Sequence, residues 1–142
     1  MPGYQTRESV GGTLTKNTWQ SVGAVVAGAL AGIILSLGSD ALMRRLGAFT
    51  LAGESMRGKY FVIATVYRTV YGVAGAYLTA RLAPRRPMMH ALVLGTLGLA
   101  ASILGAVAMW KRLPALGPHW YPIALIVLAL PTAWLGGKLR VN

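Results

Sequence analysis

The sequence contains no cysteine and only three acidic residues, which are Glu8, Asp40 and Glu54. Without cysteine the chain forms no disulfide, binds no metal through thiolate and has no cysteine nucleophile. Three acids and two histidines are too few for a carboxylate-rich metal site. These residues also assemble into no Ser-His-Asp or paired-carboxylate arrangement. We therefore expect no catalytic residue, no metal, no cofactor and no enzymatic activity.

Charge of either sign is scarce for a chain of this length. Of the 142 residues, 12% are charged and 55% are hydrophobic, and the mean hydropathy is +0.56. Soluble domains carry about 25% charged residues, so this composition predicts an integral membrane protein.

The fourteen lysines and arginines give a formal net charge of +11, which is also seen in nucleic-acid-binding proteins. Their placement indicates a different partner, because they form short clusters at the ends of apolar stretches. Cations at these positions meet anionic lipid headgroups, at about 1 kcal/mol each. We expect contact with anionic headgroups and no nucleic-acid binding. The clusters are Arg44–Arg45, Arg57–Lys59, Arg81–Arg86, Lys111–Arg112 and Lys138–Arg140.

Four apolar stretches have the length of membrane-spanning helices, since about 20 apolar residues cross the ~30 Å hydrocarbon core. Pro84 and Pro87 separate the second from the third, Pro122 suits the first turn of the fourth, and Pro131 is expected to kink it. The connections are short, so the sequence predicts an all-α, antiparallel bundle of four transmembrane helices in one domain over residues 18–142. The expected spans are about 19–43, 60–83, 88–110 and 120–137.

Residues 1–17 are polar and lack an apolar period, so we expect a flexible tail. A secretory signal peptide is disfavoured, because the following apolar run is too long and no polar cleavage segment follows it. The turn ARLAPRRP is the shortest connection and the densest in arginine. The positive-inside rule then places both termini in the cytoplasm, although Arg44, Arg45, Arg57 and Lys59 favour the opposite orientation.

Small residues recur along the expected helices at spacings that let helix backbones approach closely in lipid. Tryptophans mark the ends of the spans, where the amphipathic indole favours the membrane interface. The expected helix-packing positions are Gly28, Gly32, Gly72, Ala76, Gly98, Ser102 and Gly105. The expected interfacial residues are Trp19, Trp110, Trp120 and Trp134.

Asp40 and Arg68 are the best candidates for a polar site, because both lie inside expected spans and in the same half of the bilayer. An ionised side chain at such depth is costly unless it is paired, and it marks a functional hypothesis. An Asp40–Arg68 pair would satisfy both charges. Alternatively, Asp40 pairs with Arg44 one turn further along its own helix, and Arg68 extends to the headgroups.

Three strings of the sequence, LSLGSD, YRTVYGVAGAYLTARLAPRRPMMHALVLG and GPHWYPIALIVLALPTAWLGGKLR, resemble a group of small bacterial membrane proteins with four spans. The resemblance covers residues from about 33 to 140. It implies the bacterial inner membrane and assigns no activity, cofactor or site residue.

Two functions are consistent with these features. The first is an accessory or assembly subunit that packs its small-residue faces against a larger membrane complex or against itself. The second is a small transporter or channel protomer in which Asp40 and Arg68 line the path. Since conduction paths show more than one buried polar cluster, the sequence favours the subunit.

Overall fold

The computed structural model describes residues 6–47, 58–112 and 117–142. Its four long helices are α1 (Thr6–Arg45), α2 (Gly58–Leu82), α3 (Pro87–Met109) and α5 (Trp120–Val141), and a 3₁₀ turn, η1 (Trp110–Arg112), follows α3. Each long helix contains a segment long and apolar enough to cross a membrane. The chain is thus a multi-pass membrane protein with the predicted all-α fold.

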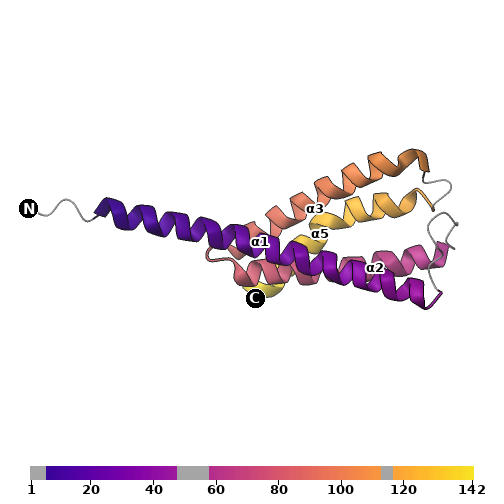
Figure 1. The fold of residues 1–142 in the computed structure, drawn as a ribbon, viewed down its shortest axis with the longest axis horizontal. Coiled ribbons are helices and arrows are strands. Elements are labelled where there is room, and N and C mark those ends of the chain that lie inside the picture. Colours follow the sequence, from indigo (N-terminus) through magenta and orange to yellow (C-terminus); the bar gives the residue numbers. More distant parts are fainter. Residues whose placement is uncertain (1–5, 48–57, 113–116) are drawn as a thin grey trace, which may run out of the picture.

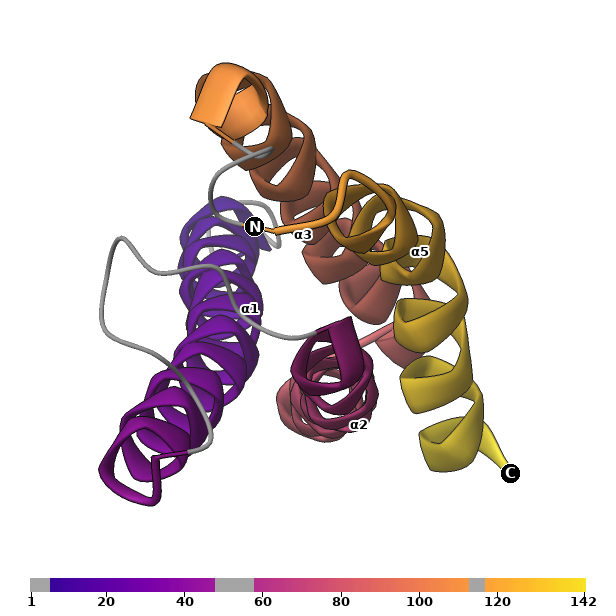
Figure 2. The ribbon, with the colours of Figure 1, turned by 90° about the vertical axis from the view of Figure 1, so that its right-hand side faces the viewer.

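The helices lie side by side, with α1 and α3 running in one direction and α2 and α5 in the other (Figure 1). Viewed along the bundle, α2 lies between α1 and α5, and α5 packs in turn on α3 (Figure 2). We call end A the end of the bundle at which α1 finishes and α2 begins. End B is the end at which α2 finishes and α3 begins, and α1 extends beyond it (Figure 1).

Glycine brings α1 and α2 into backbone contact. A Cβ atom added at Gly28 would lie 2.5 Å from the carbonyl oxygen of Gly75 and 1.8 Å from Oγ1 of Thr79. A Cβ atom at Gly75 would lie 2.7 Å from the carbonyl oxygen of Gly28. Only residues without a side chain permit this approach, and close backbone packing is a main source of helix association in lipid.

The other two principal interfaces use small residues in the same way. A Cβ atom at Gly136 of α5 would lie 2.5 Å from the carbonyl oxygen of Val73 in α2. A Cβ atom at Gly95 of α3 would lie 2.4 Å from the Cβ atom of Ala133 in α5. Large apolar side chains instead cover the outside, as expected where lipid is the solvent. The buried cluster where α2, α3 and α5 meet consists of alanines: Ala76, Ala80, Ala91 and Ala133.

Two helix boundaries differ from the sequence-based expectation. Helix α1 begins at Thr6, so residues 6–17, expected to form part of a flexible tail, are helical. Within this segment the Thr15 hydroxyl donates to the Gly11 carbonyl of the same helix at 3.1 Å. Helix α5 continues to Val141 rather than ending near Gly137, because Gly136 and Gly137 pack against neighbouring helices instead of terminating their own.

Candidate intramembrane polar site

The structure brings Asp40 and Arg68 together in an ion pair between α1 and α2, with Nη2 of Arg68 2.7 Å from Oδ2 of Asp40. Counted at 1.5 Å per residue, Asp40 lies about 8 Å from the end of α1, and Arg68 lies about 15 Å from the start of α2. The difference in depth is closed by the arginine side chain, because helical side chains tilt toward the helix N-terminus. For Arg68 that direction is toward end A.

Two tyrosines of α2 strengthen the contact with α1. The Tyr67 hydroxyl donates to Oδ1 of Asp40, so both carboxylate oxygens have partners. One turn further along α2, the Tyr71 hydroxyl and Oγ of Ser39 are hydrogen-bonded at 2.7 Å. Adjacent residues of α1 thus bond to adjacent turns of α2, which fixes the register of these two helices.

Helix α5 closes the other side of Arg68. The guanidinium carbon lies 5.8 Å from the ring centroid of Tyr121, within the range of a cation–π contact. The Tyr121 ring meets Phe61 of α2 edge-on, with centroids 5.1 Å apart. Phe61 in turn packs beneath Gly117, where an added Cβ atom would lie 2.2 Å from its Cζ. Arg68 therefore links three helices near end A.

Arg68 retains hydrogen-bonding capacity after pairing with Asp40. A guanidinium has five N–H donors, and the bond that Asp40 accepts comes from Nη2. Its Nε is buried without a hydrogen-bond partner among the described residues. The Arg68 side chain is 33% exposed, against 14% for Asp40. Each carboxylate oxygen thus has one partner, whereas the cation has donors left for another acceptor.

The alternative pairing of Asp40 with Arg44 does not form in the part of the chain that the structure describes. The sequence places Tyr67 and Tyr71 on one face of α2, for packing and for hydroxyl bonds to a neighbouring helix, and such bonds form here. It does not indicate Ser39 as the neighbour of Tyr71. It also missed Tyr121, because the pair Trp120–Tyr121 has the pattern of an interfacial belt. The proximity of Tyr121 to Arg68 depends on which helices are neighbours.

The predicted helix-packing positions fall into two groups. Gly28, Gly72 and Ala76 face neighbouring helices closely, and Gly32 makes ordinary van der Waals contact with α2. By contrast, a Cβ atom at Gly98 or Gly105 would meet no described atom within 4 Å, and Ser102 between them is half-buried. Helix packing at Gly98, Ser102 and Gly105 stays a prediction, because it requires contact with atoms other than those of the described residues.

The four tryptophans are exposed, as interfacial residues are, and they lie in two pairs at opposite ends of the bundle. Trp110 and Trp120 lie at end A, while Trp134 lies toward end B with the Lys138 ammonium 4.7 Å from its ring centroid. Trp19 belongs to the end B half of α1. The depth of the indoles in a bilayer stays a prediction.

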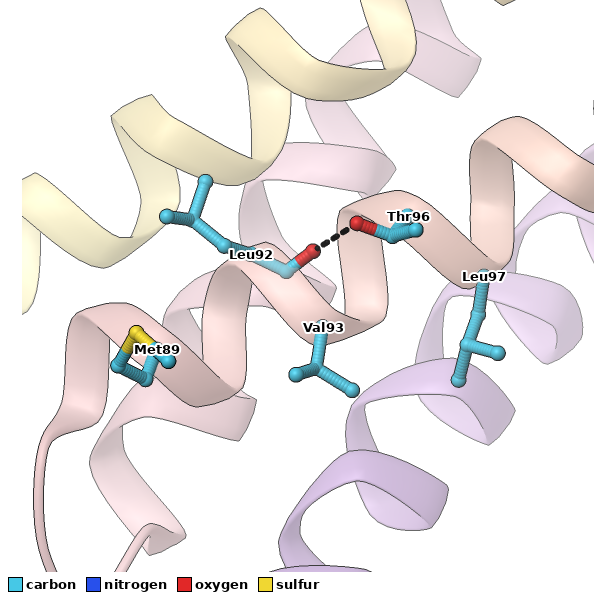
Figure 3. A pocket seen from close by; sticks show the side chains of 5 residues that line it. All are labelled: Met89, Leu92, Val93, Thr96 and Leu97. Carbon is cyan, nitrogen blue, oxygen red and sulfur yellow. Dashed lines mark hydrogen bonds between the residues drawn. The ribbon is translucent and has the colours of Figure 1, made fainter.

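An apolar groove lies on α3 away from the polar site (Figure 3). Its lining residues are Met89, Leu92, Val93, Thr96 and Leu97, and its volume is about 370 Å³. The Thr96 hydroxyl donates to the Leu92 carbonyl at 2.9 Å, so its hydrogen is used within the helix. We call this feature the α3 groove.

Among the described residues, no three of His, Cys, Asp and Glu lie close enough to hold a metal ion. The absence of enzymatic activity and cofactors stays a prediction. Comparisons with protein-family models, with curated proteins and with solved structures each gave no match. The resemblance to small bacterial four-span proteins, and the inner-membrane location it implies, therefore stay predictions as well.

Proposed function

We propose that this chain is a non-enzymatic membrane subunit that associates with a second copy, or with a larger membrane protein, through one face of α3. We call this surface the α3 small face, and its residues are Gly98, Ala101, Ser102, Gly105 and Ala108. The observation that carries the proposal is that Gly98 and Gly105 have open space where a side chain would stand, on a helix face whose other members are small as well.

The three principal interfaces inside the chain each place glycine or alanine where two helices meet. In a helix, glycine is less favourable than alanine by about 1 kcal/mol. If Gly98 and Gly105 faced lipid, they would carry this cost without a compensating contact. A helix from another subunit would provide that contact, because small residues let backbones approach to hydrogen-bond and van der Waals distance.

The polar site supports the same function. Asp40 has both oxygens bonded within the chain, and Tyr71 is bonded to Ser39. A carboxylate with both oxygens bonded to a neighbouring helix holds the two helices together, and one such cluster is less than the several polar clusters of a conduction path. The site then acts as a clamp that keeps α1, α2 and α5 in a fixed arrangement while α3 presents its outer surface.

The mass of the complex in mild detergent tests this proposal. We expect the purified chain to be an oligomer or to copurify with a stoichiometric partner, and the double variant Gly98→Leu/Gly105→Leu to lose that association. The matched control is Gly23→Leu/Gly38→Leu in α1, because those glycines also have nothing within 4 Å but stand beside large exposed side chains such as Trp19, Val26 and Leu42. A monomeric, partner-free parent chain would refute the proposal, as would loss of association in the control alone.

A second function, transport of an anion, is favoured by the unused donors of Arg68. Here the polar site would release and rebind a substrate instead of only joining helices. The test is uptake of labelled inorganic phosphate into proteoliposomes, with the double variant Asp40→Ala/Arg68→Leu as the comparison. If this variant folds and associates normally but loses uptake, transport replaces the clamp as the role of the site.

A further inference from the structure

The α3 groove begins next to a basic turn. Arg85 and Arg86 are exposed and immediately precede α3, and Arg86 is its N-cap residue. Arg86 stands three residues before Met89 and seven before Val93, which places its Cα on the same face of the helix. Among the described residues, the ion pair that forms joins Arg68 to Asp40 near end A. No described carboxylate therefore forms an ion pair with Arg85 or Arg86. The turn therefore presents positive charge at end B.

The backbone at Arg86 is itself unusual. Its φ of 49° and ψ of 63° lie in the left-handed region. Among the described residues other than glycine, Arg86 alone has a positive φ. Glycine or asparagine would adopt this conformation more readily. A residue held in a sparsely populated conformation points to a local role. An anion bound at this turn would give the exposed Arg86 such a role.

The groove has the length of a single leaflet. From Met89 to Leu97 it runs about 12 Å along α3 at 1.5 Å per residue, against about 15 Å for half of the ~30 Å hydrocarbon core. Met89, Val93 and Leu97 project from the same side of α3 (Figure 3). Its apolar lining starts at end B, beside the arginines, and ends near the middle of the helix.

We propose that the α3 groove and the Arg85–Arg86 turn together bind one anionic phospholipid from the leaflet at end B. One acyl chain lies along Met89, Val93 and Leu97, and the headgroup phosphate pairs with the arginines. The N-terminal end of the α3 helix dipole adds positive potential at the same place. Basic pockets next to transmembrane helices bind anionic headgroups through these interactions.

This site is separate from the surface proposed for subunit association. At 100° per residue, Gly98 and Gly105 lie about 140° and 120° around α3 from Val93. The two glycines of the α3 small face therefore point away from the α3 groove, and Ala101, one turn after Leu97, lies at the border between the two surfaces. Lipid binding does not rest on the proposed association, and either can fail without the other.

Site-specific photo-crosslinking distinguishes a bound lipid from bulk lipid. The photoreactive residue benzoylphenylalanine replaces either Leu97, in the groove, or the exposed Leu104, which lies about 10 Å further along α3 toward end A, outside both the α3 groove and the α3 small face. The protein is placed in nanodiscs of phosphatidylcholine with phosphatidylglycerol as the minor component. We expect lipid adducts at position 97 to be enriched in phosphatidylglycerol, and adducts at position 104 to have the bulk composition.

The arginines are tested by the double variant Arg85→Gln/Arg86→Asn, in which asparagine tolerates the left-handed backbone. We expect enrichment at position 97 to fall on the order of tenfold, since two headgroup contacts are removed. Lys111→Gln/Arg112→Gln removes the same charge at the other end of α3 and should leave enrichment unchanged. Equal adduct composition at both positions, an adduct with a second protein chain at 97, or no effect of the arginine substitutions would overturn the proposal.

Discussion

Oγ1 of Thr79 in α2 occupies the space in which a side chain at Gly28 of α1 would begin. A Cβ atom at Gly28 would lie 1.8 Å from this oxygen, and Thr79 is completely buried. No hydrogen-bond partner for Oγ1 lies among the described residues. Thr79 and Gly28 are therefore in van der Waals contact, and the Thr79 hydroxyl occupies the space that glycine leaves free.

We expect Gly28→Ala to destabilise the protein by about 1–3 kcal/mol, the range for overpacking a well-packed contact. The carbonyl of Gly75 lies 2.5 Å from the new methyl carbon and cannot move without shifting α2. The free energy of unfolding in detergent or bicelles measures the effect. Gly23→Ala is the control, because that position is open and alanine favours the helix. Equal stability of the two variants would contradict the close contact.

The sequence predicted the four helices and the depth of the Asp40–Arg68 pair, because both follow from counting residues within apolar stretches. Tyr121 could not be predicted, since its contact with Arg68 depends on α5 packing beside α2. Nor could the sequence separate Gly28, which packs, from Gly98, which faces outward. In lipid both faces of a helix are apolar, so the pattern of hydrophobicity does not mark the buried side.

The helical start of α1 was missed for a different physical reason. Residues 6–17 have no apolar stripe, and composition alone predicts a tail for such a segment. Extending an existing helix fixes one residue for each added bond, whereas starting one is costly. The membrane-spanning part of α1 removes the nucleation cost, and side-chain bonds such as Thr18 Oγ1 to Leu14 O at 2.9 Å accompany the extension.

Asp40→Ala should lower the free energy of unfolding by about 1–3 kcal/mol, because it leaves the Arg68 guanidinium and the Tyr67 hydroxyl without their acceptor. The loss is below that of a fully buried pair, since the Arg68 side chain is 33% exposed. Asp40→Ala/Arg68→Leu should recover much of the stability by removing the unpaired charge. Arg44→Leu is the control and should change little. A double variant less stable than Asp40→Ala would argue against the clamp.

The Ser39–Tyr71 hydrogen bond should contribute a coupling energy of about 0.6 kcal/mol, the average for side-chain bonds between membrane helices. Ser39→Ala, Tyr71→Phe and their combination form the double-mutant cycle. Because the two hydroxyls bond to each other at 2.7 Å, the double variant should be scarcely less stable than either single variant. Strictly additive losses would show that each hydroxyl has another partner in the bilayer.

Tyr121 tests whether α5 is held to the polar site through its ring or through its hydroxyl. Tyr121→Phe keeps a ring 5.8 Å from the guanidinium carbon of Arg68, together with the edge contact to Phe61. Tyr121→Leu removes both. We expect Tyr121→Leu to cost about 1–2 kcal/mol of unfolding free energy, from the cation–π and aromatic contacts. Tyr121→Phe should stay within about 0.5 kcal/mol of the parent chain in its free energy of unfolding, because the ring face remains.

The control repeats Tyr121→Leu in the Arg68→Leu background. There the cost of Tyr121→Leu in unfolding free energy should shrink to that of the aromatic contact alone. An undiminished cost in that background would mean that Tyr121 stabilises α5 independently of the guanidinium.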